Sequence, residues 1–219
     1  MADTEKAPLG GTRVDVEGPG RIAVRRETRE SLVEARVDDG PRREGTVDTG
    51  LNFFDHMLET IAWQACLNLD VRFSHKRYHL THVVTEDVGL TLGRALARLL
   101  EERTPQGVNG LGSAHGAIDE AIALALISFE GRAGGYYDLA TPGAQKERVE
   151  DMLAADLVAF FDGLAQGARC TIHLRSLQGV DPHHVWESIF RGFGVALRNA
   201  LARNEWRAGL TAGIKGTLD

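Results

Sequence analysis

The sequence predicts an α+β fold of two tandem, duplicated half-domains, each a mixed sheet packed on two helices. Two observations lead to this prediction. A constant shift of 101 residues, which places His82 on His183, superposes two segments of about fifty residues each without a gap. Both segments also have the same order of apolar patterns, first helical, then alternating, then helical again. Such extended self-similarity indicates that one supersecondary unit has been duplicated.

The duplication also defines the expected domain organisation. Strand-rich stretches, residues 21–39 and 120–139, precede the two superposed segments. We expect a flexible N-terminus over residues 1–20, a first half-repeat over 21–105, a second over 106–204 and a C-terminal tail over 205–219.

Each half is expected to contain a helix, a strand and a second helix. The first helix covers residues 53–65, whose apolar side chains recur at the spacing of one helix face. Residues 67–73 then alternate apolar and polar side chains, as a half-buried strand does, and residues 170–174 are their counterpart. The last helices are led by Glu86 and Glu187, which we place in the first turn, where the helix dipole favours negative charge.

Composition narrows the possible partners and compartment. The chain has 25 basic and 31 acidic residues with no basic run, so we expect no nucleic-acid partner. It contains no apolar run of about 20 residues and its N-terminus is polar, so we expect a cytoplasmic protein without a membrane segment. Cys66 and Cys170 lie in apolar segments and are expected to be buried free thiols.

A histidine stands four residues before a glutamate in each half, His82 before Glu86 and His183 before Glu187. On a helix this spacing places Cβ atoms about 5–6 Å apart, so one metal ion could bind both side chains. A single pair of this kind is more often a helix cap or a surface contact, and the duplication is what favours ligation. His184 follows directly and points partly away, so the histidine doublet could serve two ions.

Two more histidines extend this set. His56 lies off the apolar stripe of its helix, and His173 lies mid-strand on the face opposite its two apolar neighbours. A strand histidine is usually satisfied by a hydrogen bond, but beside the doublet ligation becomes a real alternative. Five imidazoles and two carboxylates suit manganese, iron, cobalt, nickel or zinc. We expect His75 and His79 to be solvated, with His79 as a substitute ligand near Val83.

Several longer motifs occur in order on this duplicated frame: FFDHMLET, THVVTEDV, IDEAIALALISFEGRAG, TIHLRSLQG and DPHHVWESIFRGFGVALR. In these motifs the chain resembles the imidazoleglycerol-phosphate dehydratase family of histidine biosynthesis, from residue 25 to the C-terminus. The resemblance implies a lyase that dehydrates imidazoleglycerol phosphate, a small phosphorylated imidazole, to imidazoleacetol phosphate. It also implies two divalent ions, by preference Mn²⁺, and a homo-oligomer of 24 subunits with sites built between neighbours.

The resemblance assigns roles to individual positions. Glu30 matches an acidic residue near the reacting carbon and is a candidate for proton transfer, while Glu86 and Glu187 serve catalysis as metal ligands. The implied metal ligands are His56, His82, Glu86, His173, His183, His184 and Glu187. The implied substrate contacts are Glu30, Gln64, Arg132, Arg191 and Lys215, the last of which lies in the tail and, like the arginines, suits a phosphate dianion.

The chain departs from the family pattern at positions that the resemblance assigns to metal and substrate binding. Val83 stands where the family usually has a second histidine, so we expect one metal ion to bind more weakly, to recruit water or His79, or to be absent. Gln64 replaces a usual histidine, Gly110 a usual arginine, and residues 213–215 a usual Ser-Ser-Lys. Two alternatives to the dehydratase therefore stay open: a divergent paralogue with another substrate, and a metal-loaded assembly or binding protein without catalysis.

Overall fold

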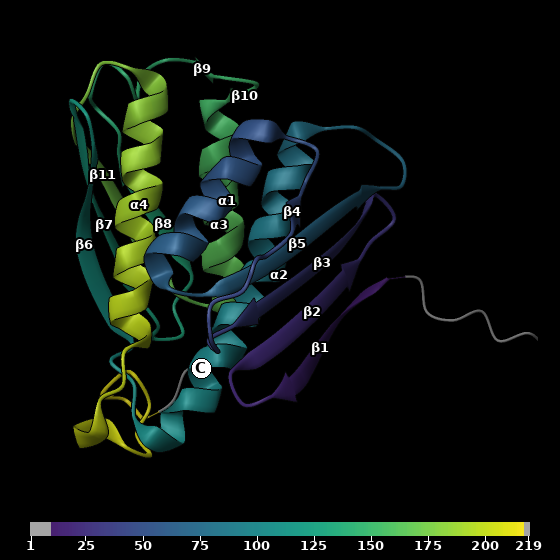
Figure 1. Ribbon diagram of the computed structural model, residues 1–219, viewed down its shortest axis with the longest axis vertical. Coiled ribbons are helices and arrows are strands. Elements are labelled where there is room, and N and C mark those ends of the chain that lie inside the picture. Colours follow the sequence, from purple (N-terminus) through teal and green to yellow (C-terminus); the bar gives the residue numbers. More distant parts are fainter. Residues whose placement is uncertain (1–9, 217–219) are drawn as a thin grey trace, which may run out of the picture.

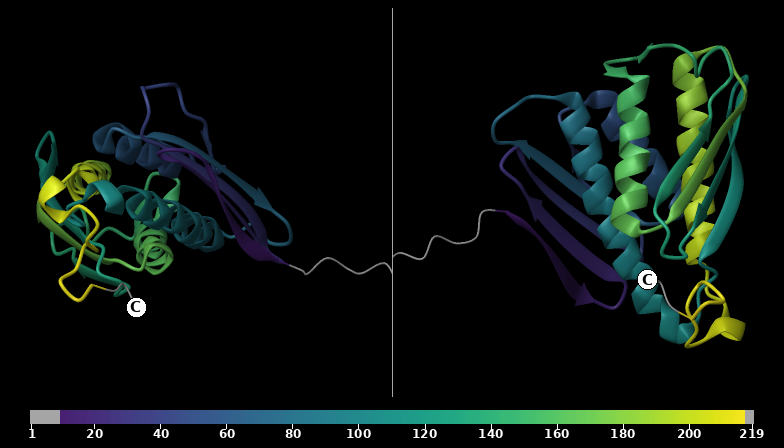
Figure 2. Two further views of the ribbon diagram at one scale, coloured as in Figure 1. Left: turned by 90° about the horizontal axis from the view of Figure 1, so that it is seen from below. Right: turned by 180° about the vertical axis from the view of Figure 1, so that it is seen from behind.

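A computed structural model describes residues 10–216 of the chain (Figure 1). Within these residues, a layer of four α-helices lies between two β-sheets, and each sheet belongs to one half of the sequence. Two further views show the sheets on opposite sides of the helical layer (Figure 2). The helices are α1 (Asn52–Ala65), α2 (Thr81–Arg103), α3 (Ala154–Ala168) and α4 (Pro182–Leu201).

Four strands of the first sheet, β2-β3-β5-β4, follow the same order as the four strands of the second sheet, and β1 is an additional edge strand; this confirms the predicted duplication of a mixed sheet on two helices. The first sheet runs β1-β2-β3-β5-β4 and the second β6-β7-β11-β8; in each the final strand is parallel to its neighbour and the others are antiparallel. The first-half strands are β1 (Gly11–Gly18), β2 (Arg21–Glu27), β3 (Ser31–Asp38), β4 (Val47–Asp48) and β5 (Asn68–His75). The second-half strands are β6 (Leu111–Ile118), β7 (Ala121–Ser128), β8 (Gly134–Asp138) and β11 (Thr171–Gln178).

Short elements connect these parts. The two-residue strands β9 (Arg148–Val149) and β10 (Met152–Leu153) pair with each other and lead directly into α3. Two 3-10 helices, η1 (Thr104–Gln106) and η2 (Glu205–Arg207), follow α2 and α4. No helix in residues 10–216 is both long and apolar enough to cross a membrane.

The turns of the two leading hairpins correspond to each other. In the β2–β3 turn the Thr28 N–H donates to the Ser31 carbonyl over 2.9 Å, which makes Glu30 the second central residue. In the β6–β7 turn the last pair is Ile118 with Ala121, which makes Glu120 the second central residue. Glu30 and Glu120 therefore occupy equivalent positions in the two halves.

The helical layer interleaves the halves, because α1 lies against α4 and α2 lies against α3. The α2–α3 contact is close enough to require glycine: a Cβ atom at Gly163 would lie 2.5 Å from the Glu86 carbonyl oxygen. Elsewhere the helices interlock through aromatic rings, such as Phe54 of α1 edge-on to Phe160 of α3 at 5.1 Å. Each functional helix is thus held by a helix of the other half.

Several sequence-based expectations need correction. The shift between corresponding residues of the two halves is not constant. Helix α3 has 15 residues where α1 has 14, and the loop from β11 to α4 has three residues where the loop from β5 to α2 has five. Strand β1 occupies residues 11–18 of the expected flexible N-terminus, because they pair with β2; residues 1–9, and 217–219 of the tail, lie outside the described part. Cys66 is exposed because it forms the left-handed C-cap of α1, whereas Cys170 is buried.

The helix starts also differ from expectation. Helices α2 and α4 begin at Thr81 and Pro182, so the two glutamates lie in the second turn and the histidines in the first. The reason is visible in α4, where the Asp181 side chain caps the helix by accepting from the N–H groups of His183 and His184.

Candidate metal centre

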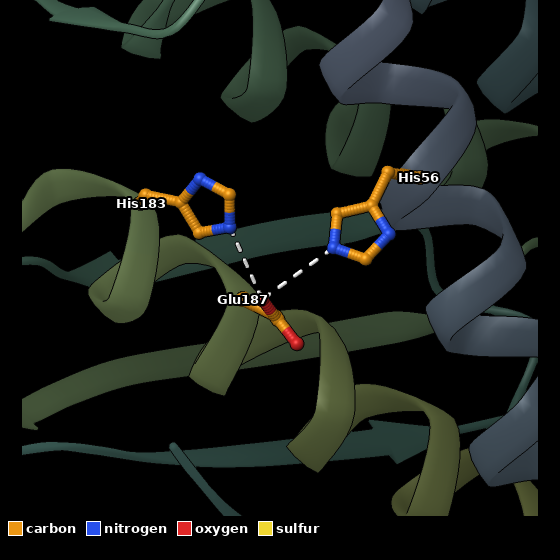
Figure 3. Close-up of side chains that lie close together, drawn as sticks. All are labelled: His56, His183 and Glu187. Atoms are coloured by element: carbon orange, nitrogen blue, oxygen red, sulfur yellow. Dashed lines mark hydrogen bonds and ion pairs between the residues drawn. The ribbon is translucent and has the colours of Figure 1, made fainter. Parts of the chain in front are cut away.

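Three side chains from two helices converge on one point (Figure 3). His56 comes from α1, while His183 and Glu187 lie one turn apart on α4. Glu187 Oε2 lies 3.2 Å from His183 Nε2 and 3.5 Å from His56 Nε2. One potential ligand atom from each residue lies within 4.8 Å of the other two, so this group could hold a metal ion. Because α1 belongs to the first half and α4 to the second, the centre exists only when the halves are packed together.

The neighbours of His183 fix its ring. The Phe53 ring packs edge-on against it at 5.1 Å, and the second nitrogen, Nδ1, lies 2.9 Å from Glu150 Oε1. Both ring nitrogens therefore face carboxylate oxygens. Because a carboxylate oxygen only accepts, a neutral His183 ring bonded to Glu150 through Nδ1–H requires a proton or a cation between Nε2 and Glu187. This arrangement fits a bound cation.

Glu187 is the buried member, with 5% of its surface exposed. Its other oxygen, Oε1, accepts hydrogen bonds of 2.9 and 2.7 Å from Arg191, which also donates to the Ala117 carbonyl over 3.1 Å. Burial alone would raise the pKa of Glu187, but the hydrogen bonds and charge of Arg191, with a further contribution from His56, lower it below its usual value. The carboxylate is therefore ionised and ready to bind a cation.

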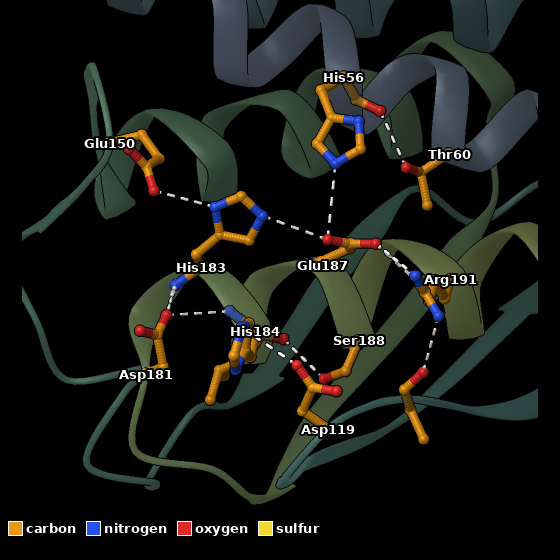
Figure 4. A network of polar contacts seen from close by, with 12 residues as sticks. His56, Thr60, Asp119, Glu150, Asp181, His183, His184, Glu187, Ser188 and Arg191 are labelled. Carbon is orange, nitrogen blue, oxygen red and sulfur yellow. Dashed lines mark hydrogen bonds and ion pairs between the residues drawn. The ribbon is translucent and has the colours of Figure 1, made fainter.

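His184 turns away from this group (Figure 4). Its Nδ1 lies 2.7 Å from Glu120 Oε2 and its Nε2 lies 3.5 Å from Asp119 Oδ2, both in the β6–β7 turn. Hydrogen bonds from the Asp181 backbone, from His184 and from the Val180 backbone lower the pKa of Glu120 to about 2. The same contact with Glu120 raises the pKa of His184. The rings of the two adjacent histidines therefore point in different directions.

The first half carries a looser version of the centre. His82 Nε2 lies 3.9 Å from Glu86 Oε2, and its Nδ1 lies 3.7 Å from Asp156 Oδ1 on α3. These residues again come from one helix of each half, but among the described residues they do not form a compact group of three ligands. Val83 is partly buried against the hydrophobic core. His79 packs against His75, with ring centroids 4.2 Å apart.

The remaining predicted residues lie elsewhere on this chain. The His173 ring stacks on Tyr136 of β8 at 4.9 Å, and Arg132 pairs with Glu130 over 2.9 Å. Glu30 is exposed in the β2–β3 turn. Within the described residues, the contacts recorded for His56, His183 and Glu187 include none with Glu30, Gln64, Arg132, His173 or Lys215.

Three acidic residues of the site escaped the sequence-based prediction. Glu120, Glu150 and Asp156 each face a histidine nitrogen but stand far from it in the sequence. Only Asp156 had a usable signal, because the repeat aligned it with Asp55 beside His56. For the other two the contact depends on where a turn lies against the start of α4, which no local pattern encodes.

Comparison with known proteins identifies relatives of the whole chain. Residues 49–197 match the family described as "Imidazoleglycerol-phosphate dehydratase". A protein of that name from Methylococcus capsulatus is 34% identical over 89% of this chain and 96% of its own length. Another of that name, from Aromatoleum aromaticum, is 37% identical over 89% of this chain and 97% of its own length.

Solved structures agree with these relatives. The structure of IGPD from Pyrococcus furiosus in complex with (S)-C348 superposes with a TM-score of 0.73 at 30% identity, covering 88% of this chain and 98% of that one. The imidazoleglycerol-phosphate dehydratase of Staphylococcus aureus superposes with a TM-score of 0.70 at 25% identity, covering 79% of this chain and 95% of that one. The fold and the sequence therefore point to the same family.

Proposed function

The chain belongs to the imidazoleglycerol-phosphate dehydratase family, and on that premise we propose that it dehydrates imidazoleglycerol phosphate to imidazoleacetol phosphate in histidine biosynthesis, with divalent metal ions as cofactors. The observation that carries the proposal is the convergence of His56, His183 and Glu187 on one point. Two imidazoles and a carboxylate are a donor set that suits Mn²⁺ as well as iron, cobalt, nickel or zinc. We propose His82 and Glu86 as the first-half contribution to a second ion, with His184 and His173 as further ligands.

In the proposed reaction the imidazole ring of the substrate must accept negative charge. One carbon of the glycerol chain loses a proton, the neighbouring carbon loses its hydroxyl as water, and the resulting enol becomes the product ketone. A divalent cation held by these residues would stabilise negative charge on the substrate imidazole. Glu187 supports this role because Arg191 and burial hold its carboxylate in one place. Glu30, exposed at a turn, is our candidate for the group that moves the proton.

We propose that cationic side chains bind the substrate phosphate. Within residues 10–216 of one chain, Arg132 and Lys215 do not lie in the His56–His183–Glu187 group. We propose that neighbouring subunits of a 24-subunit homo-oligomer, active in the cytoplasm, complete the site with these residues and Gln64. Light scattering of the purified protein tests this: a mass near that of one chain would contradict it.

The direct test is turnover of imidazoleglycerol phosphate by purified protein supplied with Mn²⁺. We expect product to form, and to disappear after the metal is removed by a chelator and return when it is added back. The Glu30→Gln variant should keep its metal and lose turnover, which separates proton transfer from metal binding. Absence of product from protein with metal bound would contradict the proposal.

One observation favours a second function. Val83 is partly buried against the core at the position that corresponds to His184, so the first half has one imidazole fewer. A divergent paralogue that acts on another imidazole or hydroxylated substrate would need only the better-formed centre. Metal content per chain distinguishes the readings: two ions favour the dehydratase, one favours the paralogue, and none favours a protein without catalysis.

A further inference from the structure

The ring of His184, a predicted metal ligand, is held by a carboxylate that other hydrogen bonds fix in turn. Its Nδ1 lies 2.7 Å from Glu120 Oε2, and its side chain keeps 31% of its surface exposed. Its Nε2 lies 3.5 Å from Asp119 Oδ2, longer than a normal hydrogen bond. The ring is turned by 82° from that of His183, with centroids 6.0 Å apart. It therefore addresses a different point in space from the His56–His183–Glu187 group.

Glu120 is itself held by a second set of bonds. Its other oxygen, Oε1, accepts from the backbone N–H groups of Val180 and Asp181 over 3.2 and 3.0 Å. The Asp181 side chain in turn accepts from the N–H groups of His183 and His184 at the start of α4. The two oxygens of Glu120 thus have separate tasks, because Oε1 anchors the turn to the helix start and only Oε2 faces the ring.

We infer that Glu120 is a positioning residue that holds His184 with its proton on Nδ1 and the lone pair of Nε2 free for a metal ion, an inference that rests on the proposed function. A carboxylate oxygen only accepts, so the Nδ1 that faces it must donate. In a neutral imidazole the other nitrogen is then the acceptor that can bind a metal. Carboxylates behind ligating histidines commonly set the ring orientation and tautomer in this way.

Glu120 differs in this respect from the other carboxylate behind the doublet. Glu150 Oε1 faces Nδ1 of His183, and no other hydrogen bond of its side chain is recorded within residues 10–216. An amide at position 150 could rotate to offer its oxygen to Nδ1–H. An amide at position 120 could not do so without giving up the Val180 and Asp181 N–H groups, which require its oxygen. Substitution by glutamine should therefore weaken metal binding at position 120 and have little effect at position 150.

The first half lacks the matching pair. Glu30 occupies the turn position that corresponds to Glu120, but the residue that corresponds to His184 is Val83. Glu120 is therefore committed to an imidazole, whereas Glu30 is not. This difference agrees with the proposed use of Glu30 as a group that moves a proton.

The test compares Mn²⁺ binding by wild-type protein, Glu120→Gln, Glu120→Ala and Glu150→Gln, measured as affinity and ions per chain by equilibrium dialysis. In Glu120→Gln the amide nitrogen donates to Nδ1, which moves the ring proton to Nε2 and blocks it. Loss of a partner behind a metal ligand typically weakens binding by about 10–100-fold. We expect a loss of this size at one site in Glu120→Gln, and less than about threefold change in Glu150→Gln.

The alanine variant distinguishes positioning from simple structural support. If Glu120 only anchors the turn, Glu120→Ala must weaken Mn²⁺ binding more than Glu120→Gln, and that order would overturn the inference. The inference expects Glu120→Gln to bind at least as weakly as Glu120→Ala while its metal-free melting temperature stays closer to wild type. Wild-type protein that binds no Mn²⁺ would instead refute the proposed function, and the inference with it.

Discussion

The two halves of the molecule each place a histidine and a glutamate one turn apart near the start of a helix, yet among the described residues only the pair on α4 belongs to a compact group of three potential ligands. In the second half His183 and Glu187 lie 3.2 Å apart and His56 joins them from the opposite half. In the first half His82 and Glu86 lie 3.9 Å apart. The two halves therefore have similar backbones at these positions. The neighbouring carboxylates and the Asp181 cap determine how firmly each histidine ring is held.

The supports of the two halves also differ. At the start of α4, Asp181 caps the helix and Glu120 and Glu150 orient the doublet. Among the described residues, the start of α2 has no side-chain cap, and the carboxylate behind His82 is Asp156, whose Oδ1 lies 3.7 Å from Nδ1. The candidate metal ligands of the second half are therefore more strongly preorganised than those of the first half.

The largest effect is expected from the buried glutamate of the compact centre. Glu187→Gln removes the charge that would hold the cation but keeps a group that can accept from Arg191, so the protein should fold and lose at least about 100-fold in turnover, or ~2.7 kcal/mol of barrier. Glu86→Gln, at the looser and more exposed position, should cost less. Metal content and turnover of both variants measure this, and equal losses would abolish the distinction between the halves.

The second prediction concerns a variant that places an imidazole at position 83 of the first half. Val83→His should bind Mn²⁺ more tightly at the first-half site, and a ligand that contributes about 1.4 kcal/mol corresponds to a tenfold change in affinity. Val83→Asn is the matched control, because it also places a polar group at this partly buried position without offering an imidazole. Metal titration of the two variants should separate them, and equal affinities would show that position 83 does not face the site.

A third difference concerns how α2 and α4 are anchored next to their glutamates. The buried Asp87 pairs with Arg26 over 2.6 Å and accepts from Ser31. The hydroxyl of the corresponding Ser188 instead donates within its own helix, to the Val185 carbonyl. Asp87→Ala leaves Arg26 without its partner and should lower the free energy of unfolding by about 3 kcal/mol. Ser188→Ala should cost about 1 kcal/mol.

Denaturant unfolding of the metal-free proteins compares the two anchors. The metal-free state is chosen so that changes at the site do not enter the result. A smaller loss in Asp87→Ala than in Ser188→Ala would contradict the assignment of the ion pair as the stronger anchor.

The smallest effect is the pH dependence of stability that one carboxylate of the first half, Asp70, contributes. Burial opposes ionisation of Asp70, but hydrogen bonds from Arg43 and from the Thr46 N–H, with the charge of Arg43, lower its pKa. The unfolded state then binds the proton more readily, so this contribution is present above the unfolded pKa of about 3.9 and is lost as the pH falls through the lower folded value.

Asp70→Asn should therefore lower the free energy of unfolding by about 1 kcal/mol at pH 7, with the difference from wild type shrinking below pH ~4. Asp15→Asn is the control, because Asp15 pairs with Arg13 on an exposed strand and should change little. A difference between Asp70→Asn and wild type that stayed constant down to pH ~2.5 would rule out this linkage.

The duplication, the mixed α+β character and the i, i+4 spacing of His183 and Glu187 could all be predicted from the residues alone. These features are written in local periodicity and in repeated residue order, which survive without knowledge of the packing. The same patterns could not locate helix starts to better than a turn, because the Asp181 cap is a hydrogen bond and not a periodicity.

The residues that meet at the candidate site are brought together by the packing of helices and turns that lie far apart in the sequence. His56 joins His183 because α1 packs on α4 across the halves, and Glu120 meets His184 because a hairpin turn lies against a helix start 64 residues away. Such contacts follow from the docking of whole elements, which sums many weak side-chain contacts spread along the chain. For that reason the candidate metal ligands could be proposed from the residues, whereas the difference in support between the two halves could not be predicted from them.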